Sequence, residues 1–95
     1  MTGAWVYIIT NRPNGTLYVG VTNDIRRRAW EHREGLCEGF SMRYGLNRLV
    51  YVEQHPTMID AIRREKAIKR WRRAWKIRVN LGANPDWTDL YETIV

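Results

Sequence analysis

Two tyrosines flank a hairpin signal near the N-terminus of the chain. Tyr7 lies in a β-branched and aromatic run, residues 5–11, that predicts a strand, and Tyr18 lies in the alternating run of residues 16–21. Residues 12–15 between them are Arg-Pro-Asn-Gly, and Asn-Gly is a strong signal for a tight hairpin turn. A loop of two or four residues places both hydroxyls on one face, whereas an odd-length loop without a bulge separates them. The alternative is that both rings are ordinary half-buried aromatics of a sheet.

Arg28 and His32 follow on a segment with helical periodicity, from residue 25 to about residue 34. The residues just before it are all good N-caps, namely Thr22, Asn23 and Asp24. At positions i and i+4, Arg28 and His32 emerge on one helix face, and Ile25 and Ala29 make that face the inward one. An arginine directed toward a sheet requires an anion, because a buried unpaired charge is costly. That anion is either a ligand or a carboxylate of the protein itself.

Glu65 interrupts the apolar stripe of a basic helical segment that runs from residue 57 to about residue 82. It lies between Ile62 and Ile68 on that stripe, so its carboxylate is predicted to face the core side. An inward carboxylate is rare unless it is paired, hydrogen-bonded or bound to a metal. An internal salt bridge with Arg28 is therefore the alternative to a functional role for both residues.

Five side chains could converge on one hollow: Tyr7, Tyr18, Arg28, His32 and Glu65. Such a set suits phosphodiester hydrolysis. The arginine stabilises charge that builds on phosphorus, the glutamate holds a hard cation, and a tyrosine or the histidine handles protons. A lone carboxylate favours one metal ion, Mg²⁺ or Mn²⁺, with water and a phosphate oxygen as the other ligands.

Basic residues outnumber acidic ones, 16 to 10, which gives a net charge of +6 and a sequence pI near 10.0. This surplus favours a polyanion partner, nucleic acid first and an anionic membrane second, although a small basic domain that docks on an acidic protein is a further possibility. The candidate contacts to a phosphate backbone are Arg26, Arg27, Arg63, Lys66, Lys69, Arg70 and Arg73. Trp71 and Trp75 continue the apolar stripe and are predicted core residues, whereas Trp30 lies off the inward stripe and is predicted to be exposed.

The elements that must position these residues fit one domain, residues 1–95. Residues 49–53 predict a third strand, and a break in the long basic helix is expected near residues 70–75. A tail from residue 87 onward is expected to dock through Trp87, Leu90 and Tyr91. The predicted order is β-β-α-β-α-α, which indicates an α+β fold.

Other classes of protein are disfavoured by what the sequence lacks. It has no run of about 18 apolar residues that would predict a membrane span, and its first residues do not resemble a signal peptide. Cys37 is the lone cysteine, so neither an internal disulfide nor a thiolate zinc cage is expected. A cytoplasmic protein is therefore expected.

The motifs in this order resemble those of a known family. Val6-Tyr7-Ile8 followed by Tyr18-Val19-Gly20 resembles the paired motif of the GIY-YIG nucleases, in particular the small stand-alone bacterial members that consist of little more than the catalytic domain. Residues 21–28, Glu31-His32, residues 61–66 and residues 68–71 are also similar to that family, so the resemblance covers about residues 4–90.

This resemblance implies a small three-stranded antiparallel sheet flanked by helices. It also implies that Tyr7 and Tyr18 lie at the scissile phosphate, one of them as a candidate general base. Arg28 would stabilise the phosphate, His32 would assist the base or the leaving group, and Glu65 would be the single metal ligand.

The sequence departs from the family at two places. Trp5-Val6 stands where the family has a glycine and isoleucine lead, although the tyrosine itself is in place. Family members often carry an active-site asparagine after the metal-binding glutamate, and both Asn80 and Asn84 are available, so that role stays unassigned.

The resulting prediction is a metal-dependent endonuclease that acts on nucleic acid, with DNA favoured over RNA, as a monomer or a transient dimer. We expect weak sequence preference and selection for branched, nicked or single-stranded structure, since the chain has no room for a separate recognition domain. The alternative is a non-catalytic nucleic-acid-binding module on the same fold.

Overall fold

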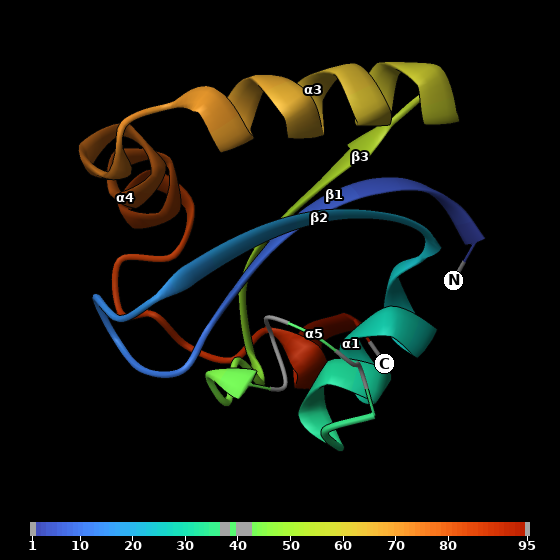
Figure 1. Ribbon diagram of the computed structural model, residues 1–95. Coiled ribbons are helices and arrows are strands. Elements are labelled where there is room, and N and C mark those ends of the chain that lie inside the picture. The colour runs from blue at the N-terminus through green and yellow to red at the C-terminus, as the bar shows by residue number, and fades with distance from the viewer. Residues whose placement is uncertain (1, 37–38, 40–42, 95) are drawn as a thin grey trace.

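The computed structural model describes residues 2–36, 39 and 43–94, which form an α+β fold on a three-stranded antiparallel sheet (Figure 1). The elements are β1 (Thr2–Thr10), β2 (Leu17–Asp24), α1 (Ile25–Arg33), β3 (Arg48–His55), α3 (Met58–Arg70), α4 (Arg73–Ala83) and α5 (Tyr91–Ile94). The predicted fold class and the predicted order of elements are confirmed, with one short helix added at the C-terminal end. Cys37 lies outside the described residues.

The central strand of the sheet is β1, and β2 and β3 are its two edge strands. In the β1–β2 ladder Tyr7 pairs with Gly20, and Ile9 pairs with Tyr18. The last pair is Thr10 with Leu17, so six residues connect the strands rather than two or four. Because six is also an even number, Tyr7 and Tyr18 lie on the same face, as predicted.

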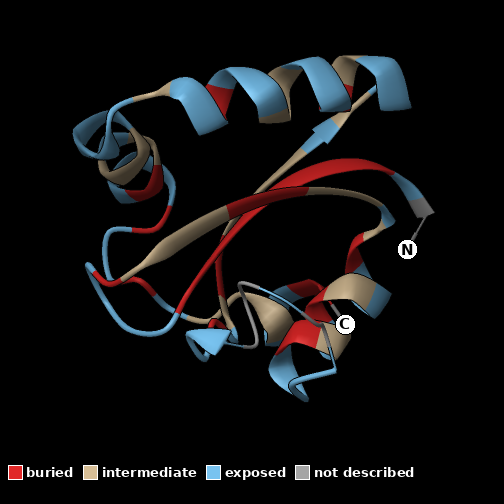
Figure 2. Ribbon diagram, viewed as in Figure 1, coloured by how far each residue is buried: buried red, intermediate tan, exposed pale blue. Residues whose placement is uncertain are grey.

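Helices pack on both faces of the sheet, and Figure 2 shows the central strand β1 buried along most of its length. One face packs Val6 and Ile8 against Ala61 and Ile68 of α3. The other face packs Tyr7 and Ile9 with Ile25 and Ala29 of α1, and with Ile94 of α5. The alternation of side chains along β1 therefore separates two helical layers, with Tyr7 on the α1 side.

A carboxylate on β3 anchors α3 to the sheet. Glu53 accepts a hydrogen bond from Nε of Arg64 at 2.8 Å and from the hydroxyl of Tyr51 at 2.5 Å. Nε2 of His55 lies 2.6 Å from the same carboxylate. A half-buried carboxylate is stable only with such partners. Because Arg64 is the neighbour of Glu65, this anchor fixes the turn of α3 that carries the predicted metal ligand.

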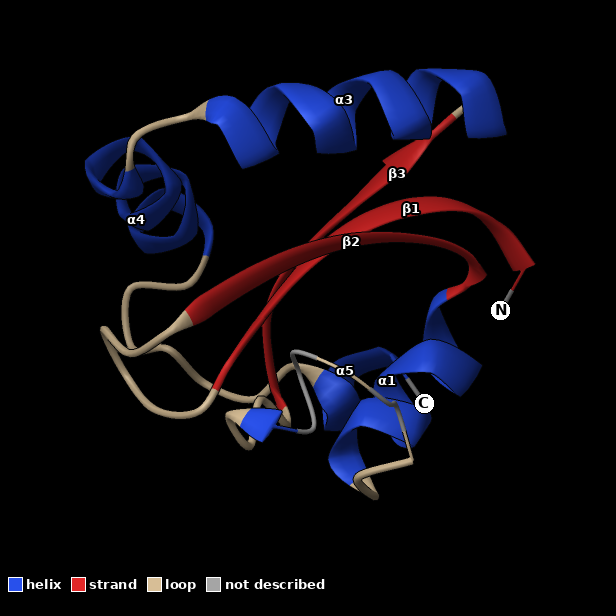
Figure 3. Cartoon of the chain, in the orientation of Figure 1, coloured by secondary structure: helices blue, strands red, loops and turns tan. Residues whose placement is uncertain are grey.

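The predicted break in the long basic helix lies at Trp71 and Arg72, which both have extended backbone conformations between α3 and α4 (Figure 3). Trp71 packs half-buried against the core, as predicted. Trp75 is 52% exposed, so its prediction as a core residue was wrong. The apolar stripe kept one helical period through the expected break, but the two extended residues change which face of α4 points inward. Trp30 is 45% exposed, which confirms its prediction.

The C-terminal tail docks along the start of β3. Trp87 is buried, and the backbone N–H of Leu90 donates to the carbonyl of Leu49 at 2.7 Å. Asn84 caps α4, and its Nδ2 donates to the carbonyl of Val50 at 3.1 Å. Throughout the described part of the chain, every helix is too short or too polar to cross a lipid bilayer.

Candidate active site

The residues singled out for chemistry gather around the outer edge of β2. This strand is at the edge of the sheet, and α1 and α3 contact it from opposite faces. Tyr7 reaches the site from the central strand, Tyr18 from the start of β2, and Arg28 and His32 from α1. The side chain of Asp24 caps α1 by accepting from the N–H of Arg27 at 3.2 Å, which fixes where that helix begins.

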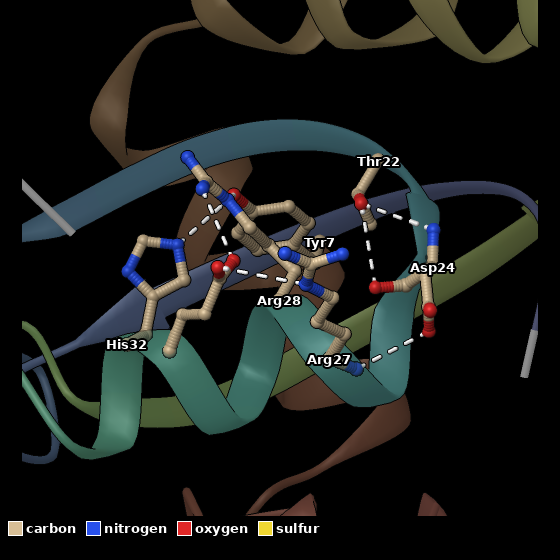
Figure 4. Close-up of polar contacts among 7 residues, drawn as sticks. Tyr7, Thr22, Asp24, Arg27, Arg28 and His32 are labelled. Atoms are coloured by element: carbon tan, nitrogen blue, oxygen red, sulfur yellow. Dashed lines mark hydrogen bonds and ion pairs between the residues drawn. The ribbon is translucent and has the colours of Figure 1, made fainter. Parts of the chain in front are cut away.

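Tyr7 is the centre of the site and is 1% exposed. Its hydroxyl lies 3.0 Å from Nε2 of His32, and Nε of Arg28 donates to the same hydroxyl at 3.3 Å (Figure 4). In one tautomer the phenol donates to Nε2, and in the other Nε2–H donates to the phenol oxygen. In either case Tyr7 and His32 share a proton between them, beside the charge of Arg28.

Gly20 makes room for the ring of Tyr7. The two residues are paired across the strands, and a Cβ on Gly20 would overlap Cζ and Oη of Tyr7. The ring cannot simply swing away, because His32 and Arg28 hold its hydroxyl. The glycine of the second motif is therefore needed for the position of the first tyrosine.

We expect Gly20→Ala to displace Tyr7 and to lower the free energy of unfolding by about 1–3 kcal/mol, the usual cost of overpacking. Thermal unfolding measures this, and the NMR signals of Tyr7 and His32 should shift with it. Gly82→Ala is the matched control, because nothing lies within 4 Å of a Cβ there, and it should be neutral or slightly stabilising. Equal stability of the two variants would contradict the packing argument.

His32 is neutral at physiological pH. Burial of the ring and then the charge of Arg28 lower its pKa from 6.5 to about 4, against the weaker opposing effect of Glu31. The ring is 3% exposed, and Nδ1 meets no hydrogen-bonding group among the described residues. A neutral imidazole beside a phenol is able to accept a proton.

The lowered pKa predicts a pH dependence of stability. In the unfolded chain His32 becomes protonated as the pH falls through about 6.5, whereas in the folded protein it stays neutral down to about pH 4. The free energy of unfolding therefore falls by on the order of 3 kcal/mol as the pH is lowered across this window. Urea unfolding at pH 7 and pH 5 measures the effect, and NMR should show His32 neutral at both. In His32→Gln this contribution should vanish, and an unchanged pH slope would contradict it.

Tyr18 and Glu65 join the site through Lys69. The rings of Tyr18 and His32 are 6.3 Å apart, and Nζ of Lys69 lies 5.7 Å from the centroid of the Tyr18 ring. The same ammonium lies 3.3 Å from Oε1 of Glu65, whose side chain is 12% exposed. Tyr7, Arg28 and His32 are thus in direct contact. The ring of Tyr18 lies next to His32, and Glu65 is linked to Tyr18 by Lys69.

The salt bridge considered between Arg28 and Glu65 gives way to pairs within each helix. Arg28 Nη1 lies 3.4 Å from Oε1 of Glu31, and Glu65 pairs with Lys69. The pairing of Glu31 with Arg28 was not predicted, and Lys69 was predicted only as a phosphate contact. The signal was available, because Glu31 lies three residues after Arg28, and Lys69 lies four after Glu65.

A groove of about 740 Å³ opens beside Arg28. It is lined by Gly3, Val21, Thr22, Asn23, Asp24, Arg27, Arg28, Glu31 and Met58. Its floor is the end of β2, one wall is the first half of α1, and Met58 belongs to the start of α3. The groove meets the site at Arg28, whose Nε contacts Tyr7, whereas Tyr7 and His32 do not themselves line it. Its volume is large enough for a nucleotide-sized group.

The residues predicted to contact a phosphate backbone fall into two groups. Arg63, Lys66, Lys69 and Arg70 are exposed on α3, and Arg27 is exposed at the groove. The other two also hold the fold together. Nε of Arg26 donates to the carbonyl of Ile94 at 3.1 Å, and Nη2 of Arg73 donates to the carbonyls of Asn14 and Gly15 in the hairpin loop.

Asn84, one of two candidates for an active-site asparagine, is placed at the opposite edge of the sheet. It is buried and bonds to the carbonyls of Val50 and Thr88. Asn80 is also buried and donates to the carbonyl of Asn84 at 3.4 Å. These contacts give Asn84 a structural role in joining the tail to β3.

Comparison with known proteins gives concordant matches. The model of the GIY-YIG catalytic domain matches residues 3–78. A UPF0213 protein of Pseudomonas aeruginosa is 36% identical over 78 residues, which cover 82% of this chain and 75% of the relative. A UPF0213 protein of Staphylococcus aureus is 32% identical over 79 residues, covering 83% and 95%. The solution NMR structure of a UPF0213 protein from Bacillus halodurans superposes with a TM-score of 0.57 at 26% identity, over 94% of each chain.

Proposed function

Because this chain belongs to the family of GIY-YIG catalytic domains, a nuclease family, we propose that it is an endonuclease that hydrolyses phosphodiester bonds in DNA with one divalent ion, Mg²⁺ or Mn²⁺. The observation that carries the proposal is the contact of Tyr7 with both His32 and Arg28 beside a groove. A phenol that shares its proton with a neutral imidazole, next to a guanidinium, suits attack on a phosphate.

In this proposal Tyr7 acts as the general base. It takes a proton from the attacking water as its own phenolic proton passes to Nε2 of His32, 3.0 Å away. Arg28 stabilises the negative charge that builds on the phosphate oxygens. It is available for this because its side chain is 39% exposed and lines the groove. Tyr18 lies on the same face of the sheet and orients the phosphate or the leaving group.

The residues at Glu65 fit a divalent ion. Its carboxylate offers hard oxygen ligands, it is mostly shielded from bulk water, and its counter-charge is a lysine that is itself 47% exposed. No cluster of three or more His, Cys, Asp or Glu side chains is found among the described residues, so water and phosphate would complete the coordination. The ion would supply Lewis-acid stabilisation of the phosphate oxygens.

We further propose that the nuclease selects DNA by its structure rather than by its sequence. The exposed basic residues of α3 suit a phosphate backbone, which carries no sequence information. Trp75 is exposed next to the basic residues Arg72, Arg73 and Lys76, and an exposed indole in such a setting suits stacking on an unpaired base. Both features favour branched or single-stranded sites over a particular duplex sequence.

Cleavage of end-labelled duplex, flap, junction and single-stranded DNA by the purified protein tests the proposal. Products should appear with Mg²⁺ or Mn²⁺ and disappear with EDTA, and substrates with unpaired bases should be cut fastest. A matching RNA panel decides between the two nucleic acids. Tight binding with no cleavage of any substrate would instead support the non-catalytic binding module. Equal cleavage rates on all DNA substrates would contradict the proposed selection for DNA structure.

A further inference from the structure

Lys69 lies where two groups of the proposed site meet. Its ammonium is 3.3 Å from the carboxylate of Glu65, one turn earlier on α3, and 5.7 Å from the centroid of the Tyr18 ring at the start of β2. It therefore stands between the carboxylate that would hold a metal ion and the tyrosine that would face the phosphate. From its sequence pattern, Lys69 is predicted only as a general contact with a polyanion.

An ammonium and a divalent ion compete for the same carboxylate. The side chain of Glu65 is 12% exposed, so its carboxylate is incompletely solvated by water and is stabilised by a nearby cation. Two cations on this carboxylate repel each other strongly at a separation of a few ångströms. A metal ion at Glu65 must therefore displace Lys69 or bind more weakly because of it.

The side chain of Lys69 is able to make this move. It is 47% exposed and ends in a compact charge on a flexible four-carbon stem. Its backbone is held in place, because the ammonium of Lys76 donates to its carbonyl at 3.3 Å. The ammonium already lies 5.7 Å from the centroid of the Tyr18 ring, and the face of this ring would still attract it once it leaves the carboxylate.

We propose that Lys69 is a displaceable counter-ion of the active site, an inference that rests on the proposed function. It holds the carboxylate of Glu65 while no metal ion is bound. When a divalent ion takes that carboxylate, the ammonium turns toward Tyr18 and contacts the phosphate of the bound nucleic acid. Lys69 thus couples metal binding to the charge offered to the substrate.

Titration with Mg²⁺ in the absence of nucleic acid tests the first half of this proposal. The NMR signals of the Glu65 backbone amide report the dissociation constant in wild type, Lys69→Met and Lys66→Met. Lys69→Met should bind Mg²⁺ about fivefold more tightly, the upper range for an ion pair of this exposure. Lys66→Met removes the same charge from an exposed neighbouring position and should change the constant by less than about twofold. Unchanged or weaker binding by Lys69→Met would overturn the inference.

Cleavage at saturating Mg²⁺ tests the second half. Lys69→Met should lower kcat by about tenfold or more with little change in KM, and Lys69→Arg should recover part of the loss because it keeps the charge. A merely structural role would instead alter thermal unfolding and leave both the Mg²⁺ constant and kcat unmoved, which overturns the inference. A parallel titration of Glu65→Gln with Mg²⁺ distinguishes failure of the Lys69 inference from failure of the proposed metal site itself. If wild type shows no Mg²⁺ binding that depends on Glu65, the proposed metal site fails as well.

Discussion

Replacing Glu65 by glutamine should abolish metal-dependent cleavage while the protein still folds and binds DNA. The substitution keeps the size and hydrogen-bonding atoms of the side chain but removes the charge that would hold the ion. Loss of the metal's stabilisation of the transition state is worth several kcal/mol, which corresponds to more than about 10³-fold in rate. Single-turnover cleavage of a labelled flap substrate, with binding measured separately by fluorescence anisotropy, checks both parts of this expectation.

Stability should change little in this variant. The pair of Glu65 with Lys69 is partly exposed, and such pairs contribute at most about 1 kcal/mol. Glu92→Gln is the matched control, because Glu92 is an exposed carboxylate of α5 that pairs with Arg33 at 3.2 Å, outside the site. Unfolding of Glu65→Gln at room temperature would show that the carboxylate is structural, and full activity would remove Glu65 from the mechanism.

The local parts of the fold were predictable because neighbouring residues determine them. The turn at Arg-Pro-Asn-Gly, a helix cap within residues 22–24 and the strand of residues 5–11 each depend on a few adjacent side chains. The face shared by Tyr7 and Tyr18 followed from the alternation of strand residues, and it tolerated an error in loop length because only its parity matters.

The parts that depend on distant contacts were not predictable. Trp75 was placed in the core because the helical period was carried across the expected break. The length of the helix indicated that a break was needed, but not that residues 71 and 72 would be extended and turn Trp75 outward. The structural task of Asn84 requires the carbonyls of Val50 and Thr88, which the sequence cannot place beside it. Likewise, the i,i+4 spacing indicates that Lys69 pairs with Glu65 but not that it also covers Tyr18.

Arg28→Lys should lower kcat by about 10²–10³-fold, the usual loss for one charge-stabilising donor, although the positive charge is retained. The guanidinium has two tasks here that an ammonium cannot perform together. Its Nε donates to Tyr7 while Nη1 pairs with Glu31, and its planar fork suits two phosphate oxygens. Arg33→Lys on the same helix, where the side chain instead stacks on Tyr91, should cleave close to the wild-type rate. Equal kcat values for Arg28→Lys and wild type would show that Arg28 contributes only its positive charge.

Combining Arg28→Lys with Tyr7→Phe separates the two tasks of the guanidinium. If Arg28 acts only by orienting the hydroxyl of Tyr7, the double variant should be no slower than Tyr7→Phe alone, because the shared contact is already lost. If Arg28 also meets the phosphate in the groove, the double variant should lose about a further tenfold or more in kcat. We expect the second outcome, because the side chain lines the groove and more than a third of it remains exposed after its contacts with Tyr7 and Glu31 are made.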